Sequence, residues 1–224
     1  MLVNKRNGNR KTREQTRKYR VPDLGYYFIV TDTKKTEENY MIGLRDSIPT
    51  DLQGKLVIKV SKTETKNLVE EAKSLVALQP QYGEPWIVFD RDQVMDFDKI
   101  VQKANAEKIN VGWSNPCIEI WFSAYFGTMP TYQGSVECCN KFSHTFEDKT
   151  KLQYSKSDKN IYSLLCKYGD EKNAIRIAEL KLAQQKEENQ KPSDMCPTTT
   201  LHLLVQEIKD KIETIDKERK IENG

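Results

Sequence analysis

The sequence predicts an α/β fold in which a parallel sheet is flanked by helices. Short apolar, β-branched and aromatic runs recur along the first half of the chain, and segments whose apolar residues have helical spacing follow them. Strands that alternate with helices form parallel sheets with right-handed crossovers, so helices cover both faces. The 224 residues are 37% hydrophobic and 31% charged, a composition typical of an ordinary folded domain.

The first predicted strand is Tyr26-Tyr27-Phe28-Ile29-Val30, a continuous apolar run followed by Thr31-Asp32-Thr33. A continuous run favours a strand that is buried on both faces. Residues 36–48 then place apolar side chains at helical spacing, and Pro49 ends that helix. The folded part of the chain therefore begins with a strand and a helix.

The same alternation continues to residue 126. Residues 56–60 predict a strand before a helix over 64–78, and residues 86–89 predict a strand before a helix that contains Phe97. A fourth strand is predicted over 109–114. The apolar segment 118–126 then predicts a buried helix.

The second half of the chain is less regular. The polar segment 127–170 is expected to be an irregular insertion. Residues 171–190 predict a charged helix with Ile177, Leu180 and Ala183 on its inner edge.

Apolar residues form one helical stripe from Leu201 to Ile215. Packing against the chain's own domain is the favoured interpretation, and a surface for a partner helix is the alternative. A second copy of this chain, forming a homo-oligomer, is one candidate partner.

Charge and pattern divide the chain into four parts: a basic arm over 1–22, an α/β core over 23–126, the insertion over 127–170 and a helical part over 171–224. Residues 1–20 carry a net charge of +7, and because the whole chain carries +3, the remainder carries −4. An arm with so few apolar residues cannot fold alone, but it can neutralise phosphates.

The arm has two interpretations. It contacts nucleic acid, or it is a tail that is either solubilising and disordered or docks on an acidic partner. The candidate nucleic-acid-binding residues are Lys5, Arg6, Arg10, Lys11, Arg13, Arg17 and Lys18.

No apolar run reaches the ~20 residues that a membrane span needs, and no apolar signal-peptide segment is present at the N-terminus. We therefore expect a cytoplasmic protein with no membrane partner. The cysteines, at 117, 138, 139, 166 and 196, are odd in number and lack paired spacing, which predicts reduced thiols. A zinc site built from Cys138, Cys139, His144 and one distant cysteine lacks CxxC spacing, so ordinary, partly buried cysteines are favoured.

Acidic residues gather where the strands are expected to end. Asp90 and Asp92 follow a buried strand, and because alternate residues of a strand share a face, both carboxylates can point to one spot. Asp32 follows the first strand, and Glu37 lies in the first turn of the next helix. If these strands are neighbours, the carboxylates converge and need a cation such as Mg²⁺. Helix capping and the helix dipole explain the same residues without a metal.

Three motifs in this order resemble those of the RloB family, which itself resembles the Toprim nucleases. They are residues 28–40, Val88-Phe89-Asp90-Arg91-Asp92, and Ser114-Asn115-Pro116-Cys117-Ile118-Glu119-Ile120-Trp121. The likeness covers roughly residues 20–126 and returns near 192–204. It implies a Toprim-like fold, a role in bacterial defence against phage, and an ATPase partner protein.

The resemblance also implies site residues. Asp32 stands where the family has Glu, Lys35-Thr36-Glu37 matches its KTE stretch, and Asn115-Pro116 with Glu119 matches its NPxxE motif. The implied catalytic residues are Asp32, Lys35, Glu37, Asp90 and Asp92. The implied ligands of Mg²⁺ or Mn²⁺ are Asp32, Asp90, Asp92 and Glu119.

The function implied by the resemblance is metal-dependent cleavage of RNA, transfer RNA included, or of DNA. Asp32 is one methylene shorter than the family's Glu, so the alternative is a non-catalytic binding or sensor subunit of a defence complex. A nucleotide-binding domain is the third interpretation, but the chain has neither a GxxxxGK[ST] loop nor a GxGxxG motif after the first strand.

Overall fold

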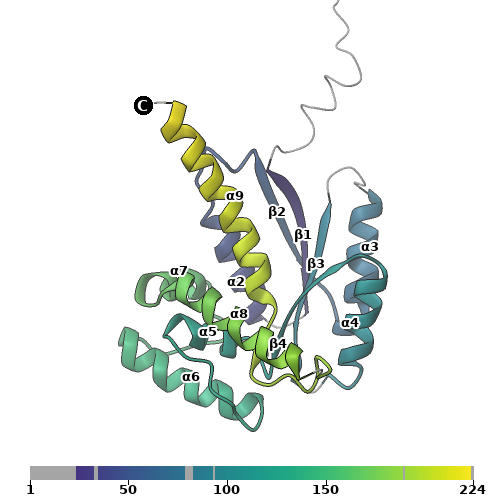
Figure 1. Ribbon diagram of the computed structural model, residues 1–224, viewed down its shortest axis with the longest axis vertical. Coiled ribbons are helices and arrows are strands. Elements are labelled where there is room, and N and C mark those ends of the chain that lie inside the picture. The colour runs from purple at the N-terminus through teal and green to yellow at the C-terminus, as the bar shows by residue number, and fades with distance from the viewer. Residues whose placement is uncertain (1–23, 33–34, 79–82, 93, 189, 223–224) are drawn as a thin grey trace, which may run out of the picture.

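The structure is a computed structural model that describes residues 24–32, 35–78, 83–92, 94–188 and 190–222. Element labels follow Figure 1. The basic arm, including the seven candidate nucleic-acid-binding residues from Lys5 to Lys18, lies outside the described residues.

The core of the structure is a five-stranded sheet in the order β2-β1-β3-β4-β5 (Figure 1). The strands β1 (Gly25–Thr31), β2 (Leu56–Lys62), β3 (Glu84–Asp90) and β4 (Asn110–Asn115) are parallel to their neighbours. Only β5 (Thr198–Thr199) is antiparallel, and it pairs with β4. The predicted α/β fold with a parallel sheet flanked by helices is confirmed, and it is consistent with a Toprim-like fold.

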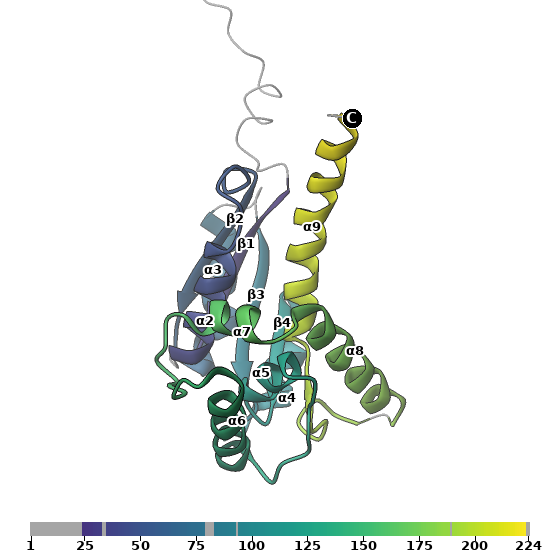
Figure 2. The same cartoon turned by 90° about the vertical axis from the view of Figure 1, so that its left-hand side faces the viewer.

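Helices cover both faces of the sheet, as Figures 1 and 2 show. Neighbouring strand residues point to opposite faces, so Ile29 and Val88 belong to one buried cluster while Val30 and Phe89 belong to the other. Because both sets are buried, the strands read as continuous apolar runs.

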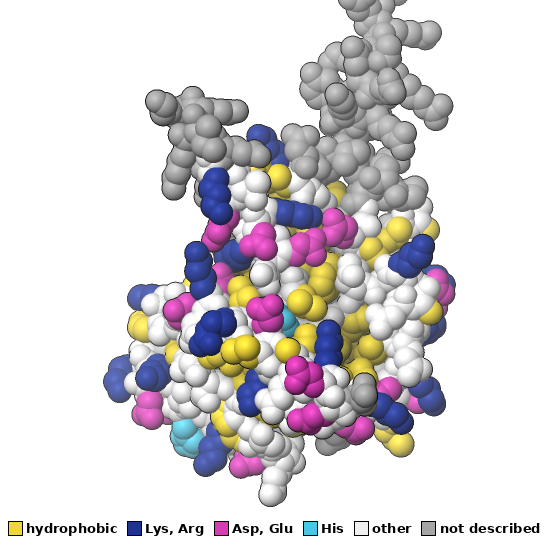
Figure 3. Space-filling view, viewed as in Figure 1, with side chains coloured by type: hydrophobic (Ala, Val, Ile, Leu, Met, Phe, Trp, Pro, Cys, Tyr) yellow, Lys and Arg dark blue, Asp and Glu magenta, His cyan; other side chains and the backbone are white. Residues whose placement is uncertain are grey.

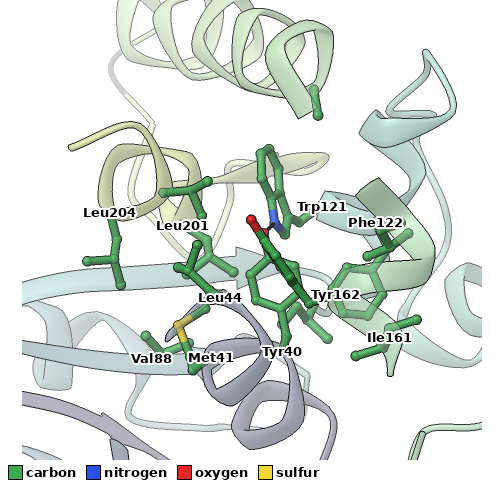
Figure 4. Packing of buried hydrophobic residues seen from close by; sticks show 14 of the residues in the cluster. Tyr40, Met41, Leu44, Val88, Trp121, Phe122, Ile161, Tyr162, Leu201 and Leu204 are labelled. Carbon is green, nitrogen blue, oxygen red and sulfur yellow. Dashed lines mark hydrogen bonds between the residues drawn. The ribbon is translucent and has the colours of Figure 1, made fainter. Parts of the chain in front are cut away.

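The smaller cluster packs under α3 (Leu68–Leu78) and α4 (Phe97–Ala106), with a short 3₁₀ turn, η1 (Thr65–Asn67), leading into α3. The larger cluster includes residues of α2 (Lys35–Asp46) and α5 (Glu119–Tyr125). Figure 4 shows Tyr40, Trp121 and Tyr162 of this cluster in contact, close to Leu201 and Leu204.

The segment 127–170, which was expected to be irregular, contains two helices, α6 (Ser135–Thr150) and α7 (Ile161–Tyr168). The buried side chains Cys138, Phe142 and Phe146 of α6 recur every four residues. This stripe is only one side chain wide and stands among polar residues, so the composition of the segment conceals it.

The predicted inner edge of α8 (Glu171–Glu187) is confirmed for Ile177, which packs partly buried against the core, and is wrong for Leu180 and Ala183. Its buried side chains are Ala174, Ala178, Leu182 and Gln185, whereas Leu180 is 58% exposed and Ala183 is exposed. Small alanine side chains allow α8 to approach α5 closely. The helix therefore buries these alanines and not the larger Leu180, which its hydrophobicity had favoured.

The last helix, α9 (Leu201–Glu222), packs its apolar stripe on its own domain, as the favoured interpretation held. Leu201, Leu204, Val205 and Ile208 are fully buried. Further along, Glu207 accepts a hydrogen bond from the hydroxyl of Tyr27 on β1. Among the described residues, no helix combines the length and apolar character that crossing a membrane requires.

Gly43 marks the close contact between α2 and α7. A Cβ at this position would lie 2.5 Å from the Cβ of Tyr162, too close without a backbone shift. We expect Gly43→Ala to lower the free energy of unfolding by about 1–3 kcal/mol, as overpacking does. Gly54→Ala is the control because no atom lies within 4 Å of its added Cβ. Equal midpoints of urea unfolding for both variants would show that α2 and α7 do not pack this closely.

His202 predicts a pH dependence of stability. Its ring is fully buried and Nδ1 lies 3.0 Å from the Thr199 carbonyl oxygen. Burial lowers the pKa of His202 to about 4 from an ordinary value of 6.5. Between pH 6.5 and pH 4, His202 is therefore protonated in the unfolded chain but neutral in the folded chain. The stability that neutral His202 contributes is fully present above pH 6.5 and is lost as the pH falls towards 4.

The expected loss is about 3 kcal/mol, since one pKa unit corresponds to about 1.4 kcal/mol. Urea unfolding across this pH range checks it. His202→Asn, whose amide nitrogen can replace Nδ1, should be less sensitive to acid than the wild type. The exposed His144, changed to Gln, is the control. Parallel pH profiles for the wild type and His202→Asn would contradict the prediction.

Candidate functional site

The site lies where the strand order reverses. Strand β1 is hydrogen-bonded to β2 on one side and to β3 on the other. The crossover from β1 to β2 and the crossover from β3 to β4 therefore run in opposite directions along the sheet. Ligands of open α/β sheets bind at such a point, beyond the carboxyl ends of the strands. The sequence placed Asp32 and Asp90 at the ends of these two strands.

Both aspartates are buried at this point, with exposed fractions of 3% for Asp32 and 4% for Asp90. The Asp32 N–H donates to the Val88 carbonyl at 3.3 Å, so Asp32 continues the pairing of β1 with β3. Asp90 is the last residue of β3. The strands that end at Asp32 and Asp90 are therefore neighbours, which was the condition for these carboxylates to lie near each other.

A pocket of about 350 Å³ opens beside Asp90. Glu37, on the first turn of α2, and Glu119, the first residue of α5, are each 1% exposed and line it. Lys35 is exposed and lines the same pocket. The remaining lining residues are Thr36, Ile118, Ser155, Lys156 and Ser157.

The sequence did not predict the wall formed by residues 155–157, or Tyr154 behind it. The Tyr154 hydroxyl donates to Glu119 Oε1 at 2.9 Å, and Lys156 Nζ lies 3.4 Å from the same oxygen. Thr36 Oγ1 donates to the Lys156 carbonyl at 3.1 Å and so ties this loop to α2. These residues lie in the segment whose structure the sequence did not reveal, and no motif marks them.

Lys156 keeps its positive charge in this wall. Burial alone would lower the pKa of Lys156, but the Glu119 carboxylate and the neighbouring thiols outweigh it and raise the pKa above its ordinary value. Burial likewise raises the pKa of the Tyr154 hydroxyl, and Glu119 raises it further. The pocket therefore contains a cation beside its carboxylates, and a neutral hydroxyl is bonded to one of them, Glu119.

Asp92 lies apart from this pocket. Strand β3 ends at Asp90, and Asp92 has a positive φ of 25°, so the alternation of a strand no longer orients its side chain. Its Oδ1 accepts a hydrogen bond from Ser135 Oγ at 2.5 Å. Asp92 lines a second pocket of about 670 Å³, which includes Glu137, Lys141 and His144.

Asn115 and Glu119 of the NPxxE motif have different partners. The Asn115 amide donates to the Ser193 carbonyl at 3.0 Å, whereas Glu119 contacts Tyr154 and Lys156. Asn115 therefore ties the end of β4 to the segment before β5. Glu119 instead lines the pocket.

Two thiols lie next to Glu119. Cys117 Sγ and Cys139 Sγ are 3.8 Å apart, and both cysteines are reduced. Hydrogen bonding to the Cys138 thiol raises the pKa of Cys117, and hydrogen bonding to Cys117 raises that of Cys139. The zinc alternative weighed from the sequence included His144, but His144 is exposed and lines the pocket of Asp92 instead.

The carboxylates fit a hard cation. Asp32 and Asp90 are buried at adjacent strand ends, and two further carboxylates line the pocket beside them. Mg²⁺ and Mn²⁺ prefer such oxygen ligands, and Mg²⁺ needs only one or two carboxylates when waters or phosphate complete its coordination. The donor set that the resemblance implies is therefore chemically suitable.

Charges alternate on the face of the described chain seen in Figure 3, where basic and acidic side chains are interspersed. A backbone phosphate track needs clustered Lys and Arg. This face does not supply such a track, so any strongly basic surface on the chain must involve other residues.

The fold and the site together define a class of protein, a Toprim-like α/β protein with buried carboxylates at the switch point of its sheet. The family model described as RloB-like protein matches residues 27–208, well over half of the chain. The chain belongs to this RloB-like family, and membership fits a defence-associated protein. Comparisons with curated proteins and with solved structures gave no match.

Proposed function

We propose that this protein is an Mg²⁺- or Mn²⁺-dependent nuclease effector of bacterial anti-phage defence that cleaves RNA, transfer RNA included, or DNA. The observation that carries the proposal is a pocket at the switch point that Asp90, Glu37 and Glu119 line, with Asp32 buried at the neighbouring strand end. Membership of the RloB-like family supports it.

The proposed metal ligands are Asp32, Asp90 and Glu119. Asp92 is included because it is the second aspartate of the Asp90-Arg91-Asp92 motif. Asp92 would have to exchange its hydrogen bond from Ser135 for the metal. When bound, the metal would orient a phosphodiester and stabilise its developing negative charge.

Other residues have roles of their own in the proposed reaction. Glu37 lines the pocket and is the candidate to accept a proton from the attacking water. Lys156 and Lys35 supply positive charge for the phosphate or the leaving oxygen. The N-terminus of α2, which begins at Lys35, adds its dipole in the same place.

We further propose that the basic arm guides nucleic acid to the pocket and that an ATPase partner controls cleavage. The arm's net charge of +7 suits phosphate contacts, whose binding weakens as salt concentration rises. Nucleic acid and the ATPase are therefore the two partners proposed for this protein.

Metal binding tests the proposed site without a substrate or a partner. Titration calorimetry with Mn²⁺ and Mg²⁺, with and without inorganic phosphate, compares the wild type with Asp90→Asn. We expect binding by the wild type and its loss in the variant. Asp46→Asn, an exposed position on α2, is the control and should bind as the wild type does. No binding by a folded wild type at millimolar metal, even with phosphate, would contradict the proposal.

A non-catalytic binding or sensor subunit is the second candidate. Two observations favour it: aspartate replaces the family's glutamate at position 32, and the Asp92 carboxylate is engaged by Ser135. A sensor would bind metal or nucleic acid without cleaving RNA or DNA, whether its partner is present or absent.

A further inference from the structure

Three metal-ligating side chains converge at the start of α5. The Sγ atoms of Cys117 and Cys139 and a carboxylate oxygen of Glu119 all lie within 4.8 Å of one another. They come from three places in the sequence: the turn after β4, the first residue of α5, and α6. Among the described residues, this is the one group of three or more His, Cys, Asp or Glu side chains whose ligand atoms lie this close together.

We propose that Cys117, Cys139 and Glu119 form a binding site for Zn²⁺. The two sulfur atoms are 3.8 Å apart. Zn–S bonds of about 2.3 Å in a tetrahedral site place two sulfurs roughly 3.8 Å apart. The thiols therefore already have the spacing that zinc requires.

The chemistry of the donors favours zinc over magnesium. Thiolates select Zn²⁺ and other soft ions, whereas Mg²⁺ requires oxygen ligands. Three protein ligands leave a fourth position for water, as in many zinc sites with an open coordination position. Glu119 lines the pocket of about 350 Å³, which gives the ion and this water a route from solvent.

The surroundings of Glu119 also suit a ligand. The Tyr154 hydroxyl donates to its Oε1 at 2.9 Å, and ligating carboxylates are usually held by such an outer hydrogen bond. Glu119 and Cys117 are buried, while Cys139 is half-buried. Two of the three ligands are therefore fixed by the core.

Lys156 is the group that zinc would displace. Its Nζ lies 3.4 Å from Glu119 Oε1, and its side chain is 60% exposed, so it can turn into solvent. Bound zinc would tie α6 to the start of α5 and would engage a carboxylate of the pocket. The site shares Glu119 with the proposed Mg²⁺ site, but its test does not depend on the proposed nuclease activity because it needs no nucleic acid.

The first test uses the reduced wild-type chain under anaerobic conditions and without added Mg²⁺, because Glu119 is also a proposed Mg²⁺ ligand. Zn²⁺ is titrated against a chromogenic chelator, and iodoacetamide labelling is mapped by mass spectrometry. We expect one zinc per chain and labelling of Cys139 slowed at least about tenfold, since a metal-bound thiolate is withheld from reaction. The exposed Cys166 is the internal control and should label at an unchanged rate.

Variants then identify the ligands. Cys139→Ser should weaken zinc binding at least about 100-fold, since even outer-shell partners are worth 10–100-fold in affinity. Cys166→Ser and Asp90→Asn should bind zinc as the wild type does, which separates this site from the proposed magnesium site. With Co²⁺ in place of Zn²⁺, the wild type should show thiolate-to-cobalt charge-transfer absorption, and Cys139→Ser should lose it.

Two results would overturn the proposal. One is equal zinc affinity in the wild type and Cys139→Ser. The other is a reduced chain that binds no zinc but forms a Cys117–Cys139 disulfide with hydrogen peroxide, in which two thiols are oxidised and the peroxide is reduced to water. That outcome would identify the pair as a redox site instead.

Discussion

Asp90→Asn is expected to reduce metal-dependent phosphodiester cleavage by at least about 100-fold. A bound metal supplies several kcal/mol of charge stabilisation, and each 1.4 kcal/mol corresponds to a factor of ten in rate. Asp90 ends β3 at the switch point and is 4% exposed, so the substitution removes a fixed ligand charge and little volume. Cleavage of transfer RNA, other RNA and DNA with Mn²⁺ or Mg²⁺ measures the effect.

The structure supplies matched controls for this experiment. Glu37→Gln should also reduce cleavage by at least about 100-fold, as loss of a general base does. Glu38→Gln, next to it in sequence, should not, because Glu38 pairs with Lys62 on the surface. Asp92→Asn should have a smaller effect than Asp90→Asn, since the Asp92 carboxylate is bonded to Ser135. If Asp90→Asn cleaves as fast as the wild type, cleavage does not depend on this site.

The strands and their terminal acids were accessible from the sequence because each depends on neighbouring residues. A run such as Tyr26 to Val30 reveals a buried strand by its composition alone. Asp32 and Asp90 then follow from the rule that ligands bind beyond strand ends. Their place at neighbouring strand ends required one further fact, the pairing of β1 with β3, which the structure supplies.

Other parts of the site depend on packing between segments far apart in the chain. Lys156 reaches Glu119 from a loop that is anchored where Tyr154 packs on Phe142, with ring centroids 4.8 Å apart. Cys117 and Cys139 are brought together by α6, a helix that the polar composition of its segment concealed. Asp92 was expected to point to the same spot as Asp90, but β3 ends at Asp90 and the alternation of side chains does not continue beyond it.

The second large effect concerns the core beneath the site. Trp121 on α5 is fully buried, and its Nε1 donates to the Tyr40 hydroxyl at 2.8 Å (Figure 4). The Tyr40 hydroxyl lies 2.8 Å from that of Tyr125, which donates to Glu171 at 3.0 Å. This network joins α2, α5 and α8 through buried indole and hydroxyl groups that end on the partly exposed Glu171.

Trp121→Ala should lower the free energy of unfolding by about 3–5 kcal/mol, because it leaves a large cavity and removes a buried donor. Trp121→Phe keeps most of the volume, so its loss should be about 1–3 kcal/mol, the cost of leaving a buried polar group without its partner. Urea unfolding measures both. Leu180→Ala, at a position that is 58% exposed, should change stability by less than about 0.5 kcal/mol.

The same substitution should reach the site, because the network fixes the two helices that carry its glutamates. Tyr40 lies one turn after Glu37 on α2, and Trp121 lies two residues after Glu119 on α5. We therefore expect Trp121→Phe, which should remain folded, to weaken Mn²⁺ binding in calorimetry, while Leu180→Ala leaves it unchanged. Loss of stability without loss of metal affinity would mean that strand ends alone position the ligands, since Asp32 and Asp90 are held by β1 and β3 rather than by α2 and α5.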